Sequence, residues 1–194
     1  MAKRYWLLIG IVGVVLVVVL RVLGVKHNTP SGQAQLMTIT PESLQQFVQD
    51  FNRSAGAERV VLLMSPTCPV CLDGSSQVEA IIERHAGKNI RVFAVWEPML
   101  PTDWARPNTH VLERLSDSRV VQVWDNNHLI AGLIEEGASG RTPKCCNRNG
   151  AWWDVIATYP PGTQWSGSAP MPDLLNGTIV STAPQLDARL GQHS

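Results

Sequence analysis

Two of the four cysteines in this 194-residue chain lie in the sequence Thr-Cys-Pro-Val-Cys at residues 67–71. A Cys-x-x-Cys pair can carry out disulfide exchange, because one thiolate attacks and the second resolves the mixed disulfide. The pair follows the apolar run Val60–Met64, which predicts a short buried strand. Ser65 and Pro66 end that run, and Pro69 suits the first turn of a helix.

This placement puts Cys68 at the N-cap of the predicted helix. Its sulfur would face the free backbone N–H groups of the first turn, at the positive end of the helix dipole. Both effects favour a thiolate, the form that attacks disulfides. Cys71 lies one turn further on, close enough to attack a mixed disulfide formed at Cys68. We therefore expect Cys68 and Cys71 to be catalytic and to form a redox-active disulfide.

Two other interpretations of the motif are a metal site and an inert structural disulfide. A zinc site needs a second pair of Cys or His ligands at compact spacing. The remaining cysteines, Cys145 and Cys146, are adjacent in the chain, which is a poor geometry for two tetrahedral ligands. The strand-to-helix placement favours the redox interpretation, and we expect neither a bound metal nor a cofactor.

The pattern from about Thr40 onward resembles the thioredoxin-like superfamily, particularly its membrane-anchored thiol-disulfide oxidoreductases. The resemblance implies an α/β fold in which helices flank a central mixed sheet. It also implies that Cys68 corresponds to the attacking cysteine and Cys71 to the resolving cysteine. The dithiol segment is the one sharp motif, and the rest of the match is the order of helices and strands.

The chain departs from the family pattern around the dithiol. Thr67 replaces a common tryptophan, and Pro-Val replaces Gly-Pro between the cysteines. The apolar run before the motif has no acid to assist proton transfer, although Glu97 could supply one; a solvated strand end is the favoured interpretation of Glu97. The family's cis-proline has its best candidate in Pro143. Thr67, Pro69 and Pro143 are the candidate substrate-binding residues.

The remaining periodicities predict the elements around this motif. The expected helices are one opening at Pro41 with Thr40 as N-cap, one from Pro69 to His85 or Ala86, a short one ending near Ser116, one closed by Gly137, and one over Pro184–Leu190. The expected strands are Val60–Met64, Ile90–Trp96, Val120–Trp124, Trp152–Tyr159 and Thr178–Ser181. The strand at 120–124 and the helix after it form an extra insertion relative to plain thioredoxin.

Cys145 and Cys146 are possible auxiliary thiols. A disulfide between neighbours closes a strained ring, so the pair is expected to be reduced. Basic residues around it would make the thiols more reactive. The pair could exchange with the Cys-x-x-Cys dithiol, capture a soft metal such as mercury or copper(I), or be a chance occurrence in a loop.

The N-terminus predicts an uncleaved, single-pass membrane anchor over residues 1–26, because Tyr5–Leu20 is uncharged and dominated by Val, Leu and Ile. A cleaved signal peptide is the alternative. Residues 27–39 are polar and predict a tether, and residues 40–194 form the thioredoxin-like domain. We expect the domain on the extracytoplasmic, periplasmic side, because that is the usual arrangement of an anchored exchanger.

The formal net charge is zero and the basic residues form no stripe, so no nucleic-acid partner is expected. The favoured function is an enzyme: a membrane-tethered thiol-disulfide oxidoreductase acting on protein thiols or disulfides outside the cytoplasm. A soft-metal binding protein of the same fold is one alternative. A peroxiredoxin-like peroxidase is another, although its Pro-x-x-x-Thr-x-x-Cys spacing is not matched by Pro66 and Thr67. The electron donor and the direction of transfer stay open.

Overall fold

The computed structural model describes residues 25–148 and 150–192. The predicted anchor falls almost wholly within residues 1–24, outside the described residues. Among the residues that are described, no helix has the length and apolar character needed to cross a bilayer.

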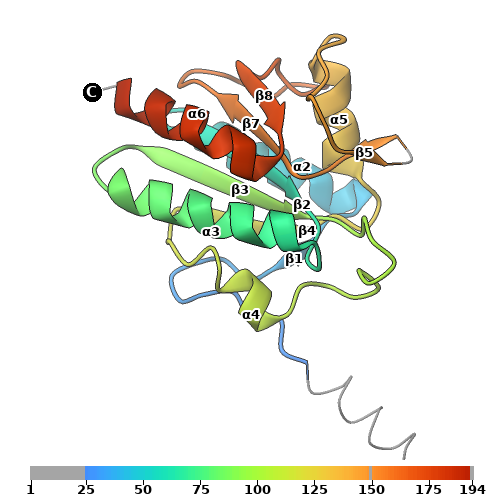
Figure 1. The fold of residues 1–194 in the computed structure, drawn as a ribbon. Coiled ribbons are helices and arrows are strands. Elements are labelled where there is room, and N and C mark those ends of the chain that lie inside the picture. Colours follow the sequence, from blue (N-terminus) through green and yellow to red (C-terminus); the bar gives the residue numbers. More distant parts are fainter. Residues whose placement is uncertain (1–24, 149, 193–194) are drawn as a thin grey trace, which may run out of the picture.

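The described chain folds around a six-stranded sheet with the strand order β1-β4-β3-β2-β7-β8 (Figure 1). The neighbouring strands β1, β4, β3 and β2 run parallel to one another. β7 runs antiparallel to β2, and β8 runs antiparallel to β7. The sheet strands are β1 (Met37–Thr38), β2 (Glu58–Met64), β3 (Ile90–Trp96), β4 (Val120–Trp124), β7 (Val155–Tyr159) and β8 (Leu174–Gly177). A separate two-stranded ribbon consists of β5 (Asn147–Arg148) and β6 (Ala151–Trp152).

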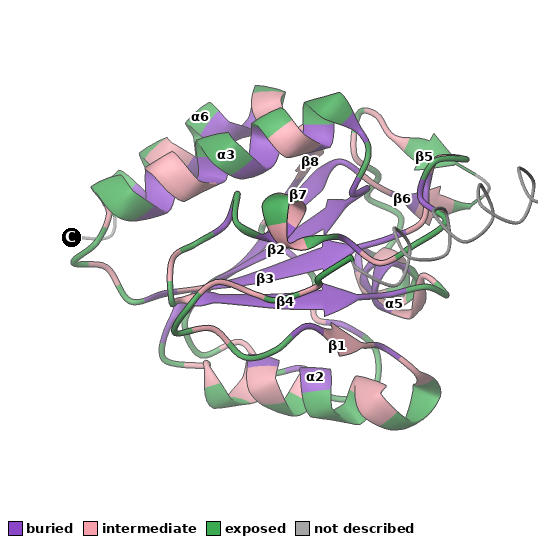
Figure 2. Ribbon diagram, turned by 90° about the horizontal axis from the view of Figure 1, so that it is seen from below, coloured by how far each residue is buried: buried purple, intermediate pink, exposed green. Residues whose placement is uncertain are grey.

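Helices cover both faces of the sheet, which divides the core into two layers. The helices are α2 (Pro41–Arg53), α3 (Pro69–Arg84), α4 (Thr109–Leu112), α5 (Leu129–Gly137) and α6 (Ile179–Gln192). Figure 2 shows α3 and α6 on one face of the purple, buried strands and α2 on the other. The first layer contains both Cys68 and Cys71, and the second contains the buried side chains of α2 and α5. The sheet is mixed and flanked by helices, as predicted, and β4 and α5 lie where the additional strand and helix were expected.

β2 and β3 form the centre of the sheet, and their sequences explain why. Every residue of β2 is buried, and β3 is buried except at Arg91, so both strands are apolar almost throughout rather than alternating. Parallel strands covered on both faces require this pattern. Their register pairs Met64 with Trp96, which places the ends of both strands, and hence the start of α3, at one edge of the sheet.

α3 and α6 pack closely because α3 has a glycine at the contact. A Cβ atom at Gly74 would lie 2.7 Å from the side chain of Ile179, nearer than two carbon atoms can approach. Gly74 is therefore the residue that lets α6 pack against the dithiol helix. A larger side chain there would push the two helices apart.

Several predicted element boundaries agree with the structure. α2 begins at Pro41 with Thr40 as N-cap, and a reciprocal hydrogen bond with Ser43 completes a capping box. β3 and β4 have the predicted bounds, and α3 ends one residue before His85.

The C-terminal prediction is wrong. Residues 178–181 form no strand, because the Thr178 hydroxyl accepts a hydrogen bond from the backbone N–H of Ser181 and so caps a helix. α6 therefore begins at Ile179 and contains Pro184 in its interior. The last strand is instead β8, Leu174–Gly177, just before it.

Residues 27–39 do not extend away from the domain as a free tether. The His27 ring nitrogen Nδ1 lies 2.8 Å from the Pro107 carbonyl oxygen, and the Gln33 amide donates to the carbonyls of Leu115 and Asp117. Met37–Thr38 adds β1 to the sheet beside β4. Side-chain hydrogen bonds and a strand pairing thus outweigh the polar composition, and the folded unit begins before Thr40.

Candidate redox site

Cys68 is the N-cap of α3, as the sequence predicts. Its backbone is extended, with φ −80° and ψ 116°, and Pro69 occupies the first helical turn. Cys68 is 6% exposed, while its neighbours Thr67, Pro69 and Val70 are exposed. Cys68 is therefore the more accessible of the two cysteines, and an incoming chain would first meet the three residues around it.

Cys71 lies behind Cys68 and is fully buried. Both cysteines are free thiols, and Cys68 lies close enough to Cys71 to interact with it. Burial raises the pKa of Cys71 far above that of an ordinary thiol, and the nearby Asp154 carboxylate raises it further. Cys71 consequently stays protonated until a base takes its proton.

Asp154 is the carboxylate in contact with the dithiol. It is 3% exposed and lies directly before β7, with φ at +55°. One oxygen accepts a hydrogen bond from the Ile179 backbone N–H at 3.1 Å, and the carboxylate is close enough to Cys71 to affect the pKa of that thiol. Burial raises the pKa of Asp154, which brings its proton affinity closer to that of a thiol.

Asp154 was not among the residues predicted from the sequence, where Glu97 was the acid considered. A lone acidic residue within the predicted apolar strand Trp152–Tyr159 was the available signal. The chain bends at that residue, so the observed strand begins at Val155. Asp154 thereby stands at the start of the strand where the resemblance implied a cis-proline.

Pro143 does not supply that cis-proline. Among the described residues, the single cis peptide bond joins Gly177 and Thr178, so the bond before Pro143 is trans. Pro143 lies in the loop between α5 and β5, outside the strand that faces the dithiol. The prediction for Pro143 as the facing proline is therefore wrong.

The buried carboxylate of Asp103 holds the segment that leads into the motif. It accepts hydrogen bonds from the Ser65 hydroxyl at 2.7 Å and from the Thr67 hydroxyl at 2.6 Å. It also accepts from the backbone N–H groups of Thr67, Met99 and Leu100. This carboxylate ties the loop after β3 to the residues just before Cys68, and so fixes where the N-cap lies.

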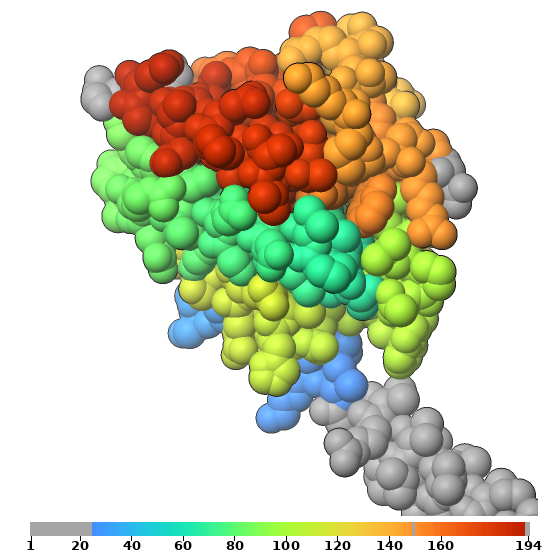
Figure 3. Space-filling model, in the orientation of Figure 1, coloured from blue at the N-terminus to red at the C-terminus, as the bar shows by residue number. Residues whose placement is uncertain are grey.

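A partly apolar surface lies next to this loop. Trp104 is 75% exposed and Val70, between the cysteines, is 45% exposed. A hollow of about 220 Å³ beside Thr67 is lined in part by Trp104 and Val25. Exposed aromatic and aliphatic side chains of this kind commonly contact partner proteins. In Figure 3 the lime segment after β3 and the orange segment before β7 border the turquoise start of α3.

Glu97 is not a solvated strand end. It is fully buried, and its Oε2 lies 2.6 Å from Nδ1 of His128. Burial raises the pKa of Glu97 to about 7. Strand alternation places Glu97 on the same face as Phe93 and Val95, opposite the cysteine layer. The carboxylate beside the dithiol is therefore Asp154 rather than Glu97.

Cys145 and Cys146 form a disulfide with each other, contrary to the expectation of a reduced pair. Cys146 adopts a φ of +79°, and both residues are half-buried. The backbone here bends sharply into the β5–β6 ribbon. That bend accommodates the small ring closed by a disulfide between adjacent cysteines, which was expected to be too strained to form.

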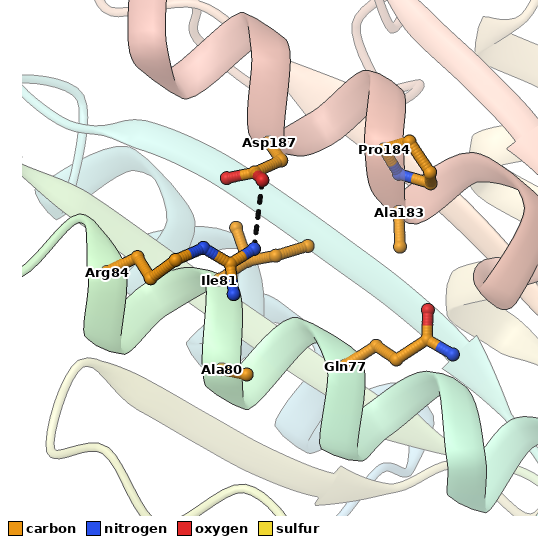
Figure 4. A pocket seen from close by; sticks show the side chains of 7 residues that line it. All are labelled: Gln77, Ala80, Ile81, Arg84, Ala183, Pro184 and Asp187. Carbon is orange, nitrogen blue, oxygen red and sulfur yellow. Dashed lines mark hydrogen bonds and ion pairs between the residues drawn. The ribbon is translucent and has the colours of Figure 1, made fainter.

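Two further observations concern possible ligands. A hollow of about 230 Å³ lies between α3 and α6, where Arg84 pairs with Asp187 and the small residues Ala80 and Ala183 leave space (Figure 4). It borders the later turns of α3, away from its Cys68 end. Within residues 25–148 and 150–192, no group of three or more His, Cys, Asp or Glu side chains is arranged to hold a metal ion.

Comparison with known proteins finds similarity at the level of structure alone. No family model matches the chain, and no curated protein matches it in sequence. Among solved structures, a secreted Mycobacterium tuberculosis disulfide oxidoreductase homologous to E. coli DsbE is 9% identical, with 71% of this chain and 82% of that chain covered and a TM-score of 0.40.

Two other solved structures are similar to the same degree. DsbF of M. tuberculosis is 14% identical, with 72% and 82% of the two chains covered and a TM-score of 0.41. The thioredoxin domain of a Bacteroides vulgatus thiol-disulfide oxidoreductase is 15% identical, with 70% and 82% covered and a TM-score of 0.40. The sheet order and the dithiol at the start of α3 agree with what the resemblance to the thioredoxin-like superfamily implies.

Proposed function

We propose that this protein is a thiol-disulfide oxidoreductase whose reacting groups are Cys68 and Cys71. The proposal rests on one observation: three groups follow one another from near the surface to the interior. Cys68 keeps a small exposed fraction at the start of α3, Cys71 lies fully buried one helical turn further on, and the buried Asp154 is close enough to Cys71 to raise the pKa of that thiol, although burial raises it more. An attacking thiol, a resolving thiol and a proton acceptor are the groups that disulfide exchange needs.

The geometry supports a two-step exchange. The Cys68 thiolate attacks a substrate disulfide, a Cys68–substrate bond forms, and the other substrate sulfur leaves as a thiolate. Cys71 then passes its proton to Asp154 and attacks Cys68. The Cys68–Cys71 disulfide forms, and the second substrate sulfur departs with its electron pair and takes up a proton. Run backwards, the same steps oxidise a substrate dithiol.

Asp154 is suited to the second step because burial has raised its pKa. A carboxylate of ordinary pKa would take a proton from a buried thiol only with difficulty, since the two proton affinities differ greatly. Desolvation narrows that difference, while the hydrogen bond from the Ile179 N–H keeps the carboxylate oriented. Asp154 thus supplies the acid for proton transfer that the apolar strand before the motif lacks.

The proposed substrates are protein thiols or disulfides, met outside the cytoplasm by a domain that residues 1–26 tether to a membrane. The apolar N-terminal composition supports the anchor. The exposed side chains of Val70 and Trp104 beside Cys68 support a protein as the partner, because they offer contact area that a small thiol would not need.

Mixed-disulfide trapping tests the proposal. A Cys71→Ala protein should form mixed disulfides that persist, because the resolving thiol is absent and Cys68 remains. The matched Cys68→Ala protein should form none, because Cys71 is fully buried. The readout is the amount of reductant-sensitive adduct after acid quenching and alkylation. A Cys71→Ala protein that captures neither a model disulfide nor a partner protein would refute the exchange function.

A further inference from the structure

We infer that the Cys145–Cys146 disulfide is a second redox site, which exchanges electrons with the Cys68–Cys71 dithiol inside the same chain. The inference rests on the proposed function, since it needs Cys68 to be an attacking thiolate. It assigns a role to a disulfide that the exchange mechanism leaves unused. The structure holds the two pairs in complementary states, one as free thiols and the other as a disulfide.

The loop that carries the disulfide is fixed to the strand facing the dithiol. The Cys146 carbonyl accepts a hydrogen bond of 2.9 Å from the Trp153 backbone N–H. Trp153 immediately precedes Asp154, and its side chain packs against the same core layer that contains Cys68 and Cys71. This hydrogen bond thus links Cys146 to the residue directly before Asp154.

A second contact places the sulfur of Cys145 beside the same carboxylate-bearing residue. A Cβ atom built on Gly177 would lie 3.1 Å from Sγ of Cys145 and 2.6 Å from the carbonyl oxygen of Asp154. Cys145 and Asp154 therefore both lie next to Gly177, the last residue of β8. Gly177 has no side chain, and this absence is what leaves room for the sulfur there.

The surroundings of the disulfide favour its opening. Both cysteines are half-buried rather than enclosed, so an approaching sulfur can reach them. Lys144 and Arg148 flank the pair, and cationic groups stabilise a departing thiolate. Figure 3 shows orange parts of the chain next to the turquoise start of α3 on this face of the molecule.

The exchange balances without any other reactant. The Cys68 thiolate attacks Sγ of Cys145, a Cys68–Cys145 bond forms, the Cys145–Cys146 bond breaks, and Cys146 leaves as a thiolate that takes up a proton. Cys71 then gives its proton to Asp154 and attacks Cys68. The Cys68–Cys71 disulfide forms and Cys145 is released as a thiol. One dithiol is oxidised and one disulfide is reduced, with two electrons transferred.

Intrachain crosslinking in the full-length protein tests the contact. The double variant Cys71→Ser with Cys146→Ser leaves Cys68 and Cys145 as the cysteines, and mild oxidation should join them in a disulfide seen by peptide mapping. Its matched control, Cys71→Ser with Cys145→Ser, leaves Cys68 and Cys146 and should crosslink more slowly. The yield should not depend on protein concentration, as an intrachain bond requires. If neither variant crosslinks within the chain, the relay is refuted.

A rate measurement tests the relay with less disturbance of the fold. Dithiothreitol should reduce Cys145–Cys146 at least about tenfold faster in the wild type than in Cys68→Ser, because an internal thiolate acts at high effective concentration. Equal rates in the two proteins would overturn the relay. Failure of the proposed function would look different when the loop pair is removed. Cys71→Ala combined with Cys145→Ser and Cys146→Ser would then capture no substrate, whereas the relay can fail while that triple variant still captures substrate.

Discussion

The two cysteine pairs of this protein differ in spacing, position and state. Cys68 and Cys71 are separated by two residues at the start of a helix, are buried in a core layer and are free thiols. Cys145 and Cys146 are adjacent, lie half-buried in a loop before a small ribbon and are joined to each other. Spacing by one helical turn lets two sulfurs meet without bending the backbone, whereas neighbours meet only where the chain turns sharply.

The two cysteine pairs also differ in their surroundings. The helix pair has a buried carboxylate, Asp154, to take its proton, and an Asp103 network that fixes its approach segment. The loop pair has exposed basic neighbours and a backbone link to Trp153. These surroundings suit the proton transfer proposed for the helix pair and the attack proposed on the loop pair.

The largest expected contrast is in alkylation. In the native protein Cys68 should react with iodoacetamide about a hundredfold faster than Cys71, because Cys71 is fully buried and its pKa is raised. Cys145 and Cys146 should not react until they are reduced. Mass spectrometry of timed samples gives the rates, and a reduced, denatured sample, in which all four cysteines react alike, is the control. Faster labelling of Cys71 than of Cys68 would reverse their assigned roles.

Asp154→Asn should slow resolution by Cys71 by about 10–100-fold, because the amide cannot accept the thiol proton. In the wild type the resolution rate should rise with pH as Asp154 ionises, through a pKa that burial raises above the ordinary carboxyl value. The variant should lose that rise while keeping the acceptor for the Ile179 N–H. Stopped-flow measurement of mixed-disulfide decay gives both results, and an unchanged pH profile would exclude Asp154 as the base.

Glu97→Gln is the matched test on the opposite face of the sheet. Burial raises the pKa of Glu97 from 4.5 to about 7, and contact with Glu97 raises the pKa of His128, so folding takes up protons. Wild-type stability should therefore fall as pH rises through this window, by about 1–3 kcal/mol.

In Glu97→Gln the stability should fall less as pH rises, because the amide does not ionise. Denaturant unfolding across the pH range measures it, and the pH profile of Cys71 resolution should stay as in the wild type. A shift of that profile by Glu97→Gln would mean that the two faces of the sheet are coupled.

Trp104→Ala should have the smallest effect, raising the KM for a protein disulfide by about 3–10-fold through loss of contact area. The rise should be larger for the protein substrate than for a small disulfide such as oxidised glutathione. Steady-state kinetics with both substrates checks this. An equal change for both would show that Trp104 acts on the dithiol rather than on substrate docking.

Local patterns in the sequence were sufficient for the elements that depend on neighbouring residues. The Cys68 N-cap, the Thr40 cap of α2 and the bounds of β3 each follow from a few adjacent side chains. The patterns misled at residues 178–181, which look like a strand although the Thr178 hydroxyl caps a helix there. They also misled at residues 27–39, which look like a tether although Met37–Thr38 pairs with the distant β4.

The amino-acid order alone determined that a Cys-x-x-Cys pair follows a buried strand and opens a helix, because strand and helix periodicity, proline and capping act over short spans of chain. Only the tertiary structure decided which acid serves that pair. Asp154 is more than eighty positions away from the dithiol along the chain, and it reaches Cys71 because β7 pairs antiparallel with β2. Glu97 is much nearer in sequence, but it follows β3 and faces the side of the sheet where Phe93 and Val95 lie, since alternate residues of a strand point to opposite faces.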